Sequence, residues 1–221
     1  MGSGKYSALS GAVAREQAMA NIAANLANVT TTGFKRDRVS FASVLRGASQ
    51  IEAGRGINHT RIQQIAADFS QGGLQETGRP LDLAIDGEGF FKVRRGGETF
   101  YTRAGHLQID ENGLVKTSEG LNLVDAANQP LQLDTTTARE IVIAESGEIS
   151  VDGEVTDGRI QVVTVNDPKR LVKAGATLYR GGEGVTDQPL ETGRVIQGSL
   201  ETANVNMMEE MAAMIRTQRS F

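Results

Sequence analysis

Few residues in this sequence have the types and spacing that catalysis or metal binding requires. The chain has only two histidines, His59 and His106, and we expect each in a loop or at a strand end rather than in a catalytic or metal site. No G-x-S-x-G turn supports a Ser-His-Asp triad. The absence of Cys excludes disulfides, zinc ribbons and thiol chemistry. We therefore expect no catalytic residue, no metal site and no cofactor.

Three short motifs are superficially similar to ligand-binding loops. The run DENG at residues 110–113 lacks the alternating acidic ligands and the final Glu of a calcium loop. GEG at residues 87–89 and GGEG at residues 181–184 lack the strand, helix and Lys context of a phosphate loop. The sequence argues against an enzyme, and a hydrolase that uses Asp110 or His106 is left only as a third alternative.

Composition bounds the class of protein. The chain has 221 residues, of which 39% are hydrophobic and 5% aromatic, and its 26 glycines exceed the usual share of about 7%. This mixture predicts many tight turns, modest cores and surface that partners bury. The net charge of −4 gives no electrostatic footprint for nucleic acid. No apolar run is long enough to span a bilayer or to form a signal-peptide core, so the default expectation is a cytoplasmic protein unless it uses another export route.

An Ala-rich helix is predicted over residues 7–29. Its apolar side chains recur at spacings of three and four, which is the narrow stripe of a coiled-coil seam. They are Leu9, Val13, Met19, Ile22, Leu26 and Val29. Burial of so few side chains does not offset the entropy of ordering the helix, so it needs a partner. Beside the seam, Asn21, Asn25 and Asn28 form either a solvated edge or a set of amides that pair with a neighbouring helix and fix its register.

The run TTTGFKR that follows predicts the C-terminal cap of this helix. Three β-branched threonines weaken the helix, and Gly33 is placed to adopt the left-handed C′ conformation. With Thr32 as the C-cap, Phe34 is expected to pack back on the last helical turn. Lys35 and Arg36 are expected to complement the negative end of the helix.

A second helix is predicted over residues 204–221, with Asn206 as its N-cap and Glu209 completing a capping-box arrangement. It has two apolar seams, and a helix that is apolar on two sides is expected to be surrounded. One seam is Val205, Met208, Ala212 and Ile215, and the other is Met207, Met211, Met214 and Phe221. A Met-rich stripe favours packing over cofactor binding. No C-cap signal is present, so we expect the helix to be cut short at Phe221.

Between the helices, short apolar runs alternate with turn dipeptides, which predicts a compact antiparallel sandwich or barrel. Asn112-Gly113 is the strongest hairpin signal. The other predicted turns are Asp86-Gly87, Gly96-Gly97, Ser146-Gly147, Asp152-Gly153 and Asp157-Gly158. The fold class is therefore mainly β with terminal α-helices that pair as a coiled-coil-like stalk.

Two further features are expected outside this β region. Residues 39–46 and 57–69 are predicted to pair as strands around a glycine-containing loop at residues 47–56. The runs QGGLQET (71–77) and QGSLET (197–202) echo one another and flank the β region like two legs. The expected organisation is a helix over residues 1–35, an extended or β linker over 36–80, a β domain over 81–195, and a return strand with a helix over 196–221.

Three ordered motifs resemble one family. NLANVTTTGFKRD (25–37), LDLAIDGEGFFKV (81–93) followed by YTRAGHLQIDENGLV, and GSLETANVNMMEEMAAMIRTQRSF (198–221) are similar to signatures of bacterial flagellar rod and hook proteins. The resemblance spans essentially the whole chain, with small departures at Ala24, Thr30 and Ala203. The motif and turn residues are Gly33, Phe34, Leu81, Asp82, Ile85, Gly87, Gly89, Phe90 and Phe91.

The resemblance implies a structural subunit of the axial rod, with terminal helices in an inner tube and β domains outside. It implies contacts with other rod subunits and with further copies of itself, export through the flagellar export apparatus without a cleaved signal peptide, and passing contact with peptidoglycan. The helix seams and the Asn stripe are then the expected assembly interface. It comprises Leu9, Val13, Met19, Ile22, Asn25, Leu26, Asn28, Val29, Asn204, Val205, Met208, Met211 and Ile215.

Within the family, the chain favours the proximal-rod (FlgF) type over the distal-rod (FlgG) type. The stretch at residues 44–61 is short, and the run at residues 160–182 is more similar to the FlgF type. A distal-rod or hook-type axial protein is the next alternative. From another class, a peptidoglycan- or carbohydrate-binding β module with helical ends is the rival, although the low aromatic content provides no stacking platform.

Overall fold

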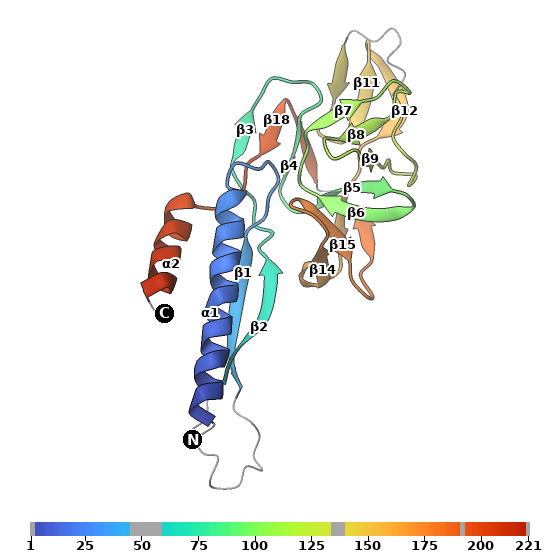
Figure 1. The fold of residues 1–221 in the computed structure, drawn as a ribbon. Coiled ribbons are helices and arrows are strands. Elements are labelled where there is room, and N and C mark those ends of the chain that lie inside the picture. The colour runs from blue at the N-terminus through green and yellow to red at the C-terminus, as the bar shows by residue number, and fades with distance from the viewer. Residues whose placement is uncertain (1–2, 45–58, 134–139, 191–192, 220–221) are drawn as a thin grey trace. The chain divides into compact units, whose positions relative to one another are not determined.

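The computed structural model describes residues 3–44, 59–133, 140–190 and 193–219. Within them the chain is mainly β, with one helix towards each end, α1 (Ser3–Ala27) and α2 (Met207–Arg219) (Figure 1). The chain divides into two compact units. Unit 1 comprises Met1–Val29, Arg36–Asp68 and Val205–Phe221, and unit 2 comprises Thr30–Lys35 and Phe69–Asn204.

Unit 1 combines the two helices with a β-hairpin. Its strands β1 (Asp37–Val44) and β2 (His59–Ala67) pair antiparallel. Helix α1 contacts both strands and α2. The predicted pairing of these two strands is confirmed, while the glycine-containing loop predicted at residues 47–56 lies outside the described residues.

Helix α1 begins at Ser3, before its predicted start, and ends at Ala27, before its predicted end. The Asn28 side-chain amide donates to the Ala24 carbonyl oxygen at 2.8 Å, while the Asn28 backbone N–H donates to Asn25 O at 3.2 Å. Because the side chain occupies the carbonyl that would accept the next α-helical bond, the ladder stops at this point.

The cap positions assigned to Thr32, Gly33 and Phe34 are wrong because α1 has already ended. Gly33 does adopt the left-handed conformation, with φ +71°. However, it lies in the segment Thr30–Lys35, which belongs to unit 2 rather than to the helix that precedes it. The turn has a role in unit 2, described below.

Helix α2 begins at Met207, and its predicted N-cap is confirmed. Asn206 Oδ1 accepts hydrogen bonds from the backbone N–H groups of Met208 (3.0 Å) and Glu209 (3.4 Å). The Glu209 carboxylate lies 3.4 Å from Arg36 Nη1, so it contacts a cation. The helix is described to Arg219, and its predicted end at Phe221 lies outside the described residues.

Unit 2 contains the other strands, all paired antiparallel, and a short 3₁₀ helix, η2 (Pro168–Arg170). The strands are β3 (Leu74–Glu76), β4 (Leu83–Asp86), β5 (Phe90–Arg95), β6 (Glu98–Thr102), β7 (Leu107–Ile109), β8 (Val115–Thr117), β9 (Asn122–Leu123), β10 (Ile141–Ile143), β11 (Glu148–Val151), β12 (Glu154–Arg159), β13 (Val162–Val165), β14 (Leu171–Lys173), β15 (Leu178–Gly181), β16 (Asp187–Pro189), β17 (Arg194–Gln197) and β18 (Ser199–Glu201).

The largest sheet of unit 2 has the strand order β14-β15-β6-β5-β9-β8-β7, with β13 joined to β5 and β16 joined to β13. Separate sheets are β10-β11-β12, β17-β4 and β18-β3. Over the described residues these sheets are open, so the barrel prediction is not confirmed. They enclose one core of fully buried apolar side chains, which includes Leu83, Ile85, Phe91, Val93 and Leu121.

Turn chemistry predicted most of the hairpins. β7 and β8 pair around Asn112-Gly113, and β11 and β12 pair around Asp152-Gly153. Asp152 and Gly153 both have positive φ. Asp157-Gly158 is an exception, because it lies inside β12 rather than in a turn. The echoing runs also pair, since β3 and β18 align Leu200 with Gln75. The two runs that flank the β region are therefore hydrogen-bonded to one another.

Candidate assembly interface

The two helices of unit 1 expose large apolar side chains. On α1, Leu9 is 60% exposed and Val13 is 44% exposed, and on α2 Met208 reaches 75%. We name this set the helix-face residues: Leu9, Val13, Met207, Met208, Met211 and Ile215. Five of the six, all except Met207, are among the residues predicted for the assembly interface, and their exposure leaves them available to a partner.

Helix α2 has an inverted distribution of polarity. Its one fully buried residue in the described part of the chain is Glu210, whose exposure is 5%. A helix of a globular unit normally buries an apolar stripe and exposes its charges. Here a carboxylate faces inward while methionines face solvent, so contacts inside this unit do not account for the apolar residues of α2.

Glu210 takes part in a polar junction with Asn25, Arg36 and Asp37. Asn25 is 1% exposed, and its amide donates to Asp37 O and accepts from Asp37 N, both at 3.0 Å. The same amide nitrogen lies 3.5 Å from Glu210 Oε2, and Arg36 Nε lies 3.3 Å from Glu210 Oε1. A primary amide both donates and accepts, which lets one side chain connect α1, β1 and α2.

The asparagines of the predicted stripe therefore differ in their contacts. Asn25 contacts another helix, as the register hypothesis predicts, and it also accompanies Asn21, whose Oδ1 lies 3.4 Å away. The Asn28 amide donates to the Ala24 carbonyl of its own helix. The predicted coiled-coil seam is not confirmed. Met19, Ile22 and Leu26 are half-buried on a helix that also contacts β1 and β2, and Val29 lies beyond the end of that helix.

The last two predicted interface residues lie at the start of the return to α2. Asn204 belongs to unit 2, where its amide donates to Ser70 O at 2.9 Å. Val205 belongs to unit 1 and is half-buried. Neither is part of the exposed helix faces.

Unit 2 contains a buried ionic group that we name the anchor cluster, formed by Lys35, Arg103 and Glu201. Lys35 Nζ lies 2.6 Å from Glu201 Oε1, and Arg103 Nη1 lies 3.1 Å from Glu201 Oε2. The three side chains are 1%, 2% and 0% exposed. Lys35 was expected at the end of the first helix, so that prediction was wrong.

Backbone groups supply further partners to the anchor cluster. Glu201 Oε1 also accepts from Gly72 N (2.8 Å), Lys35 Nζ donates to Ser70 O (2.7 Å), and Arg103 Nη2 donates to Gly87 O (2.7 Å). A buried charge is tolerated only when such partners replace its water. Sequence reasoning missed this cluster because each of its charges is typical of a solvated position when considered alone.

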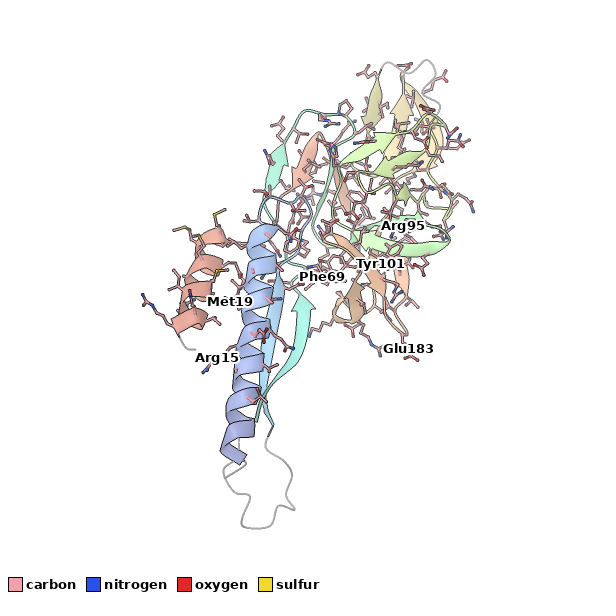
Figure 2. All side chains as sticks on the ribbon, in the orientation of Figure 1. Arg15, Met19, Phe69, Arg95, Tyr101 and Glu183 are labelled. Atoms are coloured by element: carbon pink, nitrogen blue, oxygen red, sulfur yellow. The ribbon has the colours of Figure 1, made fainter. Side chains whose placement is uncertain are left out.

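One aromatic ring of a packed group contacts the anchor cluster. The Arg103 guanidinium carbon lies 5.7 Å from the centroid of the Phe90 ring. Phe69 packs edge-on against Phe90 (5.1 Å) and Tyr179 (5.0 Å), and its position is seen in Figure 2. Phe34 is buried, with Lys173 Nζ 4.4 Å from its ring centroid.

Gly33 also contacts a residue of the anchor cluster. Its N–H donates to Glu201 O at 2.7 Å, and its φ is +71°. A Cβ at this position would overlap the backbone of Arg103 and Ala104. The close approach of the two backbones, together with the positive φ, requires glycine here.

The central motif residues build the core beside this site. Ile85, Phe90 and Phe91 are buried, and Leu81 packs against the core cluster from a half-buried position. Gly89 has φ +110°, and a Cβ there would overlap the Val162 side chain. Gly87 also has positive φ (+97°), and its carbonyl receives Arg103.

The candidate hydrolytic residues do not come together as a catalytic site. His106 Nδ1 lies 2.7 Å from Oδ1 of the buried Asp82, whereas Asp110 pairs with Lys116 in another turn. No group of three or more His, Cys, Asp or Glu side chains suited to a metal ion occurs in the described part of the chain. In that part, neither helix is long and apolar enough to cross a membrane.

Comparison with known proteins identifies the family. Residues 6–35 match the family described as "Flagella basal body rod protein", residues 84–151 match "Flagellar hook protein FlgE/F/G D1 domain", and residues 196–221 match "Flagellar basal body rod FlgEFG protein C-terminal". The FlgG basal-body rod protein of Bacillus subtilis (strain 168) is 34% identical over 238 positions, covering 98% of this chain and 90% of the relative. The chain belongs to the flagellar basal-body rod protein family.

Rod proteins of two types match this family member at similar identity. FlgF of Caulobacter vibrioides (strain ATCC 19089 / CIP 103742 / CB 15) is 31% identical over 201 positions, covering 90% of this chain and 81% of the relative. FlgG of Buchnera aphidicola subsp. Acyrthosiphon pisum (strain APS) is 33% identical over 228 positions, covering 90% and 84%. The rod protein is a structural subunit of the bacterial flagellar basal body, and its family is not enzymatic.

The three matched segments of this rod protein meet in the anchor cluster. Lys35 lies in the first segment, Arg103 in the second and Glu201 in the third. The segments that define the family therefore include the residues that hold unit 2 together at this point.

Proposed function

We propose that this rod protein is a proximal-rod subunit of the FlgF type that joins other rod subunits and further copies of itself through the helix-face residues. Burial of each such side chain against a neighbouring helix contributes about 1.5–3 kcal/mol. Contacts of this kind that do not close on themselves generate helical assemblies. In this proposal α1 and α2 supply the binding energy, and the polar junction around Asn25 holds the two helices together.

The observation that carries the proposal is the inverted polarity of α2. Met207, Met208, Met211 and Ile215 are exposed, while Glu210 is buried. Contiguous apolar exposure on a protein surface typically marks an interaction site. Flexible methionine side chains also adapt to several different neighbours, which suits a subunit with unlike contacts above and below it.

Alignment lengths support the FlgF type over the FlgG type. Two relatives cover the same 90% of this chain, but the FlgF alignment spans 201 positions and the FlgG alignment spans 228. The additional positions are insertions in the FlgG relative that this chain lacks. The proposed assignment to the FlgF type is based on this difference in length.

Export through the flagellar export apparatus without a cleaved leader, and passing contact of the periplasmic rod with peptidoglycan, are also proposed. Family membership is their only support. The peptidoglycan contact would be incidental, since an aromatic content of 5% offers little stacking surface for sugars.

Deletion and complementation in the parent bacterium test the proposal. Loss of the gene is expected to abolish motility and the rod, and the intact chain is expected to restore both. The double variant Met208→Glu, Met211→Glu is expected to fail in rescue while its isolated chain melts like the parent, because both side chains are exposed. The matched control is Gln218→Glu on the same helix, which should rescue. Intact rods and normal swimming after deletion would overturn the proposed function.

A further inference from the structure

Charge is segregated within unit 2. The three-stranded sheet β10-β11-β12 and its turns, residues 140–159, carry six exposed carboxylates and a single base, Arg159. We name this region the acidic sheet. Its carboxylates are Glu140, Glu145, Glu148, Asp152, Glu154 and Asp157.

A second region of unit 2 has the opposite charge. Residues 168–182, which comprise η2, β14 and β15, carry four bases and no Asp or Glu. We name this region the basic hairpin. Lys169, Arg170 and Arg180 are exposed and form no ion pair with any described residue. Lys173 is half-buried over the Phe34 ring.

Each charged region also presents exposed β-branched residues. In the acidic sheet, Val142 and Val155 are both paired across Ser150, so the three side chains form one row on the same face. Val142 is 47% exposed and Val155 is 71% exposed. In the basic hairpin, Val172 is 51% exposed and lies directly opposite Arg180.

The two regions lie at opposite ends of unit 2. Figure 1 shows β11 and β12 at one end and β14 and β15 at the other. Because they are far apart, they cannot neutralise one another within one copy. Like regions repel one another, which disfavours a closed two-fold contact of either region with itself.

We propose that the acidic sheet of one copy docks on the basic hairpin of a second copy, in a head-to-tail contact between their unit 2 domains. The opposite charges steer and orient the approach, and the exposed valines supply apolar area at its centre. In such a pair, one copy still has a free basic hairpin and the other a free acidic sheet. Further copies can therefore add in the same way. This inference rests on the proposed rod function and adds a second interface to that of the helices.

The absence of native cysteine permits a direct test by site-directed cross-linking. One chain carries Val155→Cys and one epitope tag, and a second chain carries Val172→Cys and a different tag. The two chains are expressed together in the deletion strain. Basal bodies are then isolated and treated with a short bismaleimide. A cross-linked dimer that contains both tags is expected. Either variant expressed alone should give no dimer.

The outcomes separate this inference from the proposed function. Basal bodies that contain the chain but yield no mixed-tag dimer would overturn the head-to-tail contact and leave the rod assignment intact. A dimer from Val155→Cys alone would also overturn it, because it would indicate a two-fold contact. Absence of the intact chain from basal bodies would overturn the proposed function itself.

Charge reversal gives an independent readout. Glu154→Lys and Arg180→Glu are each expected to lower the amount of chain in basal bodies by about tenfold, because each places like charges opposite one another. Co-expression of the two reversed chains should restore a mixed contact. The matched control is Glu111→Lys, an exposed carboxylate of unit 2 outside both regions, which should incorporate normally. Equal incorporation of all three variants would contradict the proposal.

Discussion

Lys35 Nζ lies 2.6 Å from Glu201 Oε1 in the interior of unit 2, although the two residues are 166 positions apart. Lys35 is the last residue of the unit 2 segment that comes after α1, and Glu201 is the last residue of the strand that precedes α2. The ion pair therefore fixes both connections to the helices in one unit. Arg103 joins the same carboxylate, so two cations depend on one anion.

The first prediction concerns Glu201→Gln. The change removes the only carboxylate of the anchor cluster and leaves Lys35 and Arg103 buried without it. Loss of one partner of a buried ion pair costs about 3–5 kcal/mol, so the free energy of unfolding should fall by that amount. Urea denaturation followed by circular dichroism measures it.

An exposed ion pair of unit 2 is the control. Asp86→Asn breaks the Arg194–Asp86 pair (2.8 Å), whose side chains are 62% and 35% exposed. This loss should cost less than about 1 kcal/mol, because water solvates both groups. Equal destabilisation by the two substitutions would show that burial of the anchor cluster does not matter.

The second prediction separates backbone strain from steric overlap at glycine. Gly33 and Gly78 both have positive φ, at +71° and +68°. Alanine at position 78 meets open space, so it should cost only the conformational term of about 1–2 kcal/mol. Alanine at position 33 also overlaps the Arg103–Ala104 backbone, so Gly33→Ala should be clearly more destabilising in thermal unfolding. Indistinguishable melting of the two variants would refute the close approach.

The third prediction tests the polar junction of unit 1 with two asparagines of one helix. Asn25→Ala leaves the Asp37 N–H and C=O without their amide partner, at a cost of about 1–3 kcal/mol for a buried group. Amide hydrogen exchange in α2 should accelerate as well, since Glu210 loses a contact. Asn28→Ala is the comparison variant, because its amide donates to a carbonyl of its own helix and alanine favours helix. Faster exchange in α2 from Asn28→Ala alone would contradict this assignment.

The fourth prediction concerns acid stability. The hydrogen bond from Lys116, followed by the Leu114 backbone N–H, lowers the pKa of Asp110 below its ordinary value of 3.8. The folded pKa lies below the unfolded one, so this contribution is present above pH 3.8 and is lost as pH falls through the folded value. Asp110→Asn should therefore flatten the acid end of the stability profile.

A carboxyl titration by NMR measures the same effect directly in the parent chain. Glu111→Gln is the control, because it removes an equal charge from the same turn without touching Lys116. If Asp110 titrates at or above its ordinary value in the folded chain, the Lys116 hydrogen bond does not hold in solution.

Local patterns predicted the elements of this protein, because each depends on residues that are neighbours in sequence. Turn dipeptides such as Asn112-Gly113 placed hairpins, and Asn206 placed the start of α2. The echo between two runs that flank the β region was visible in the sequence, but the structure was needed to show that they pair as β3 and β18. The motifs that resemble rod proteins were distinctive enough to indicate the family.

Tertiary structure alone decided where the charges are placed. Lys35 follows a helix in sequence, and only the approach of Arg103 and Glu201 shows that it is buried. The inward carboxylate of Glu210 and the outward methionines of α2 likewise depend on which neighbours the helix meets. Desolvation of a charge is set by groups distant in sequence, so a single sequence determines the elements of this protein but not which of its charges are buried.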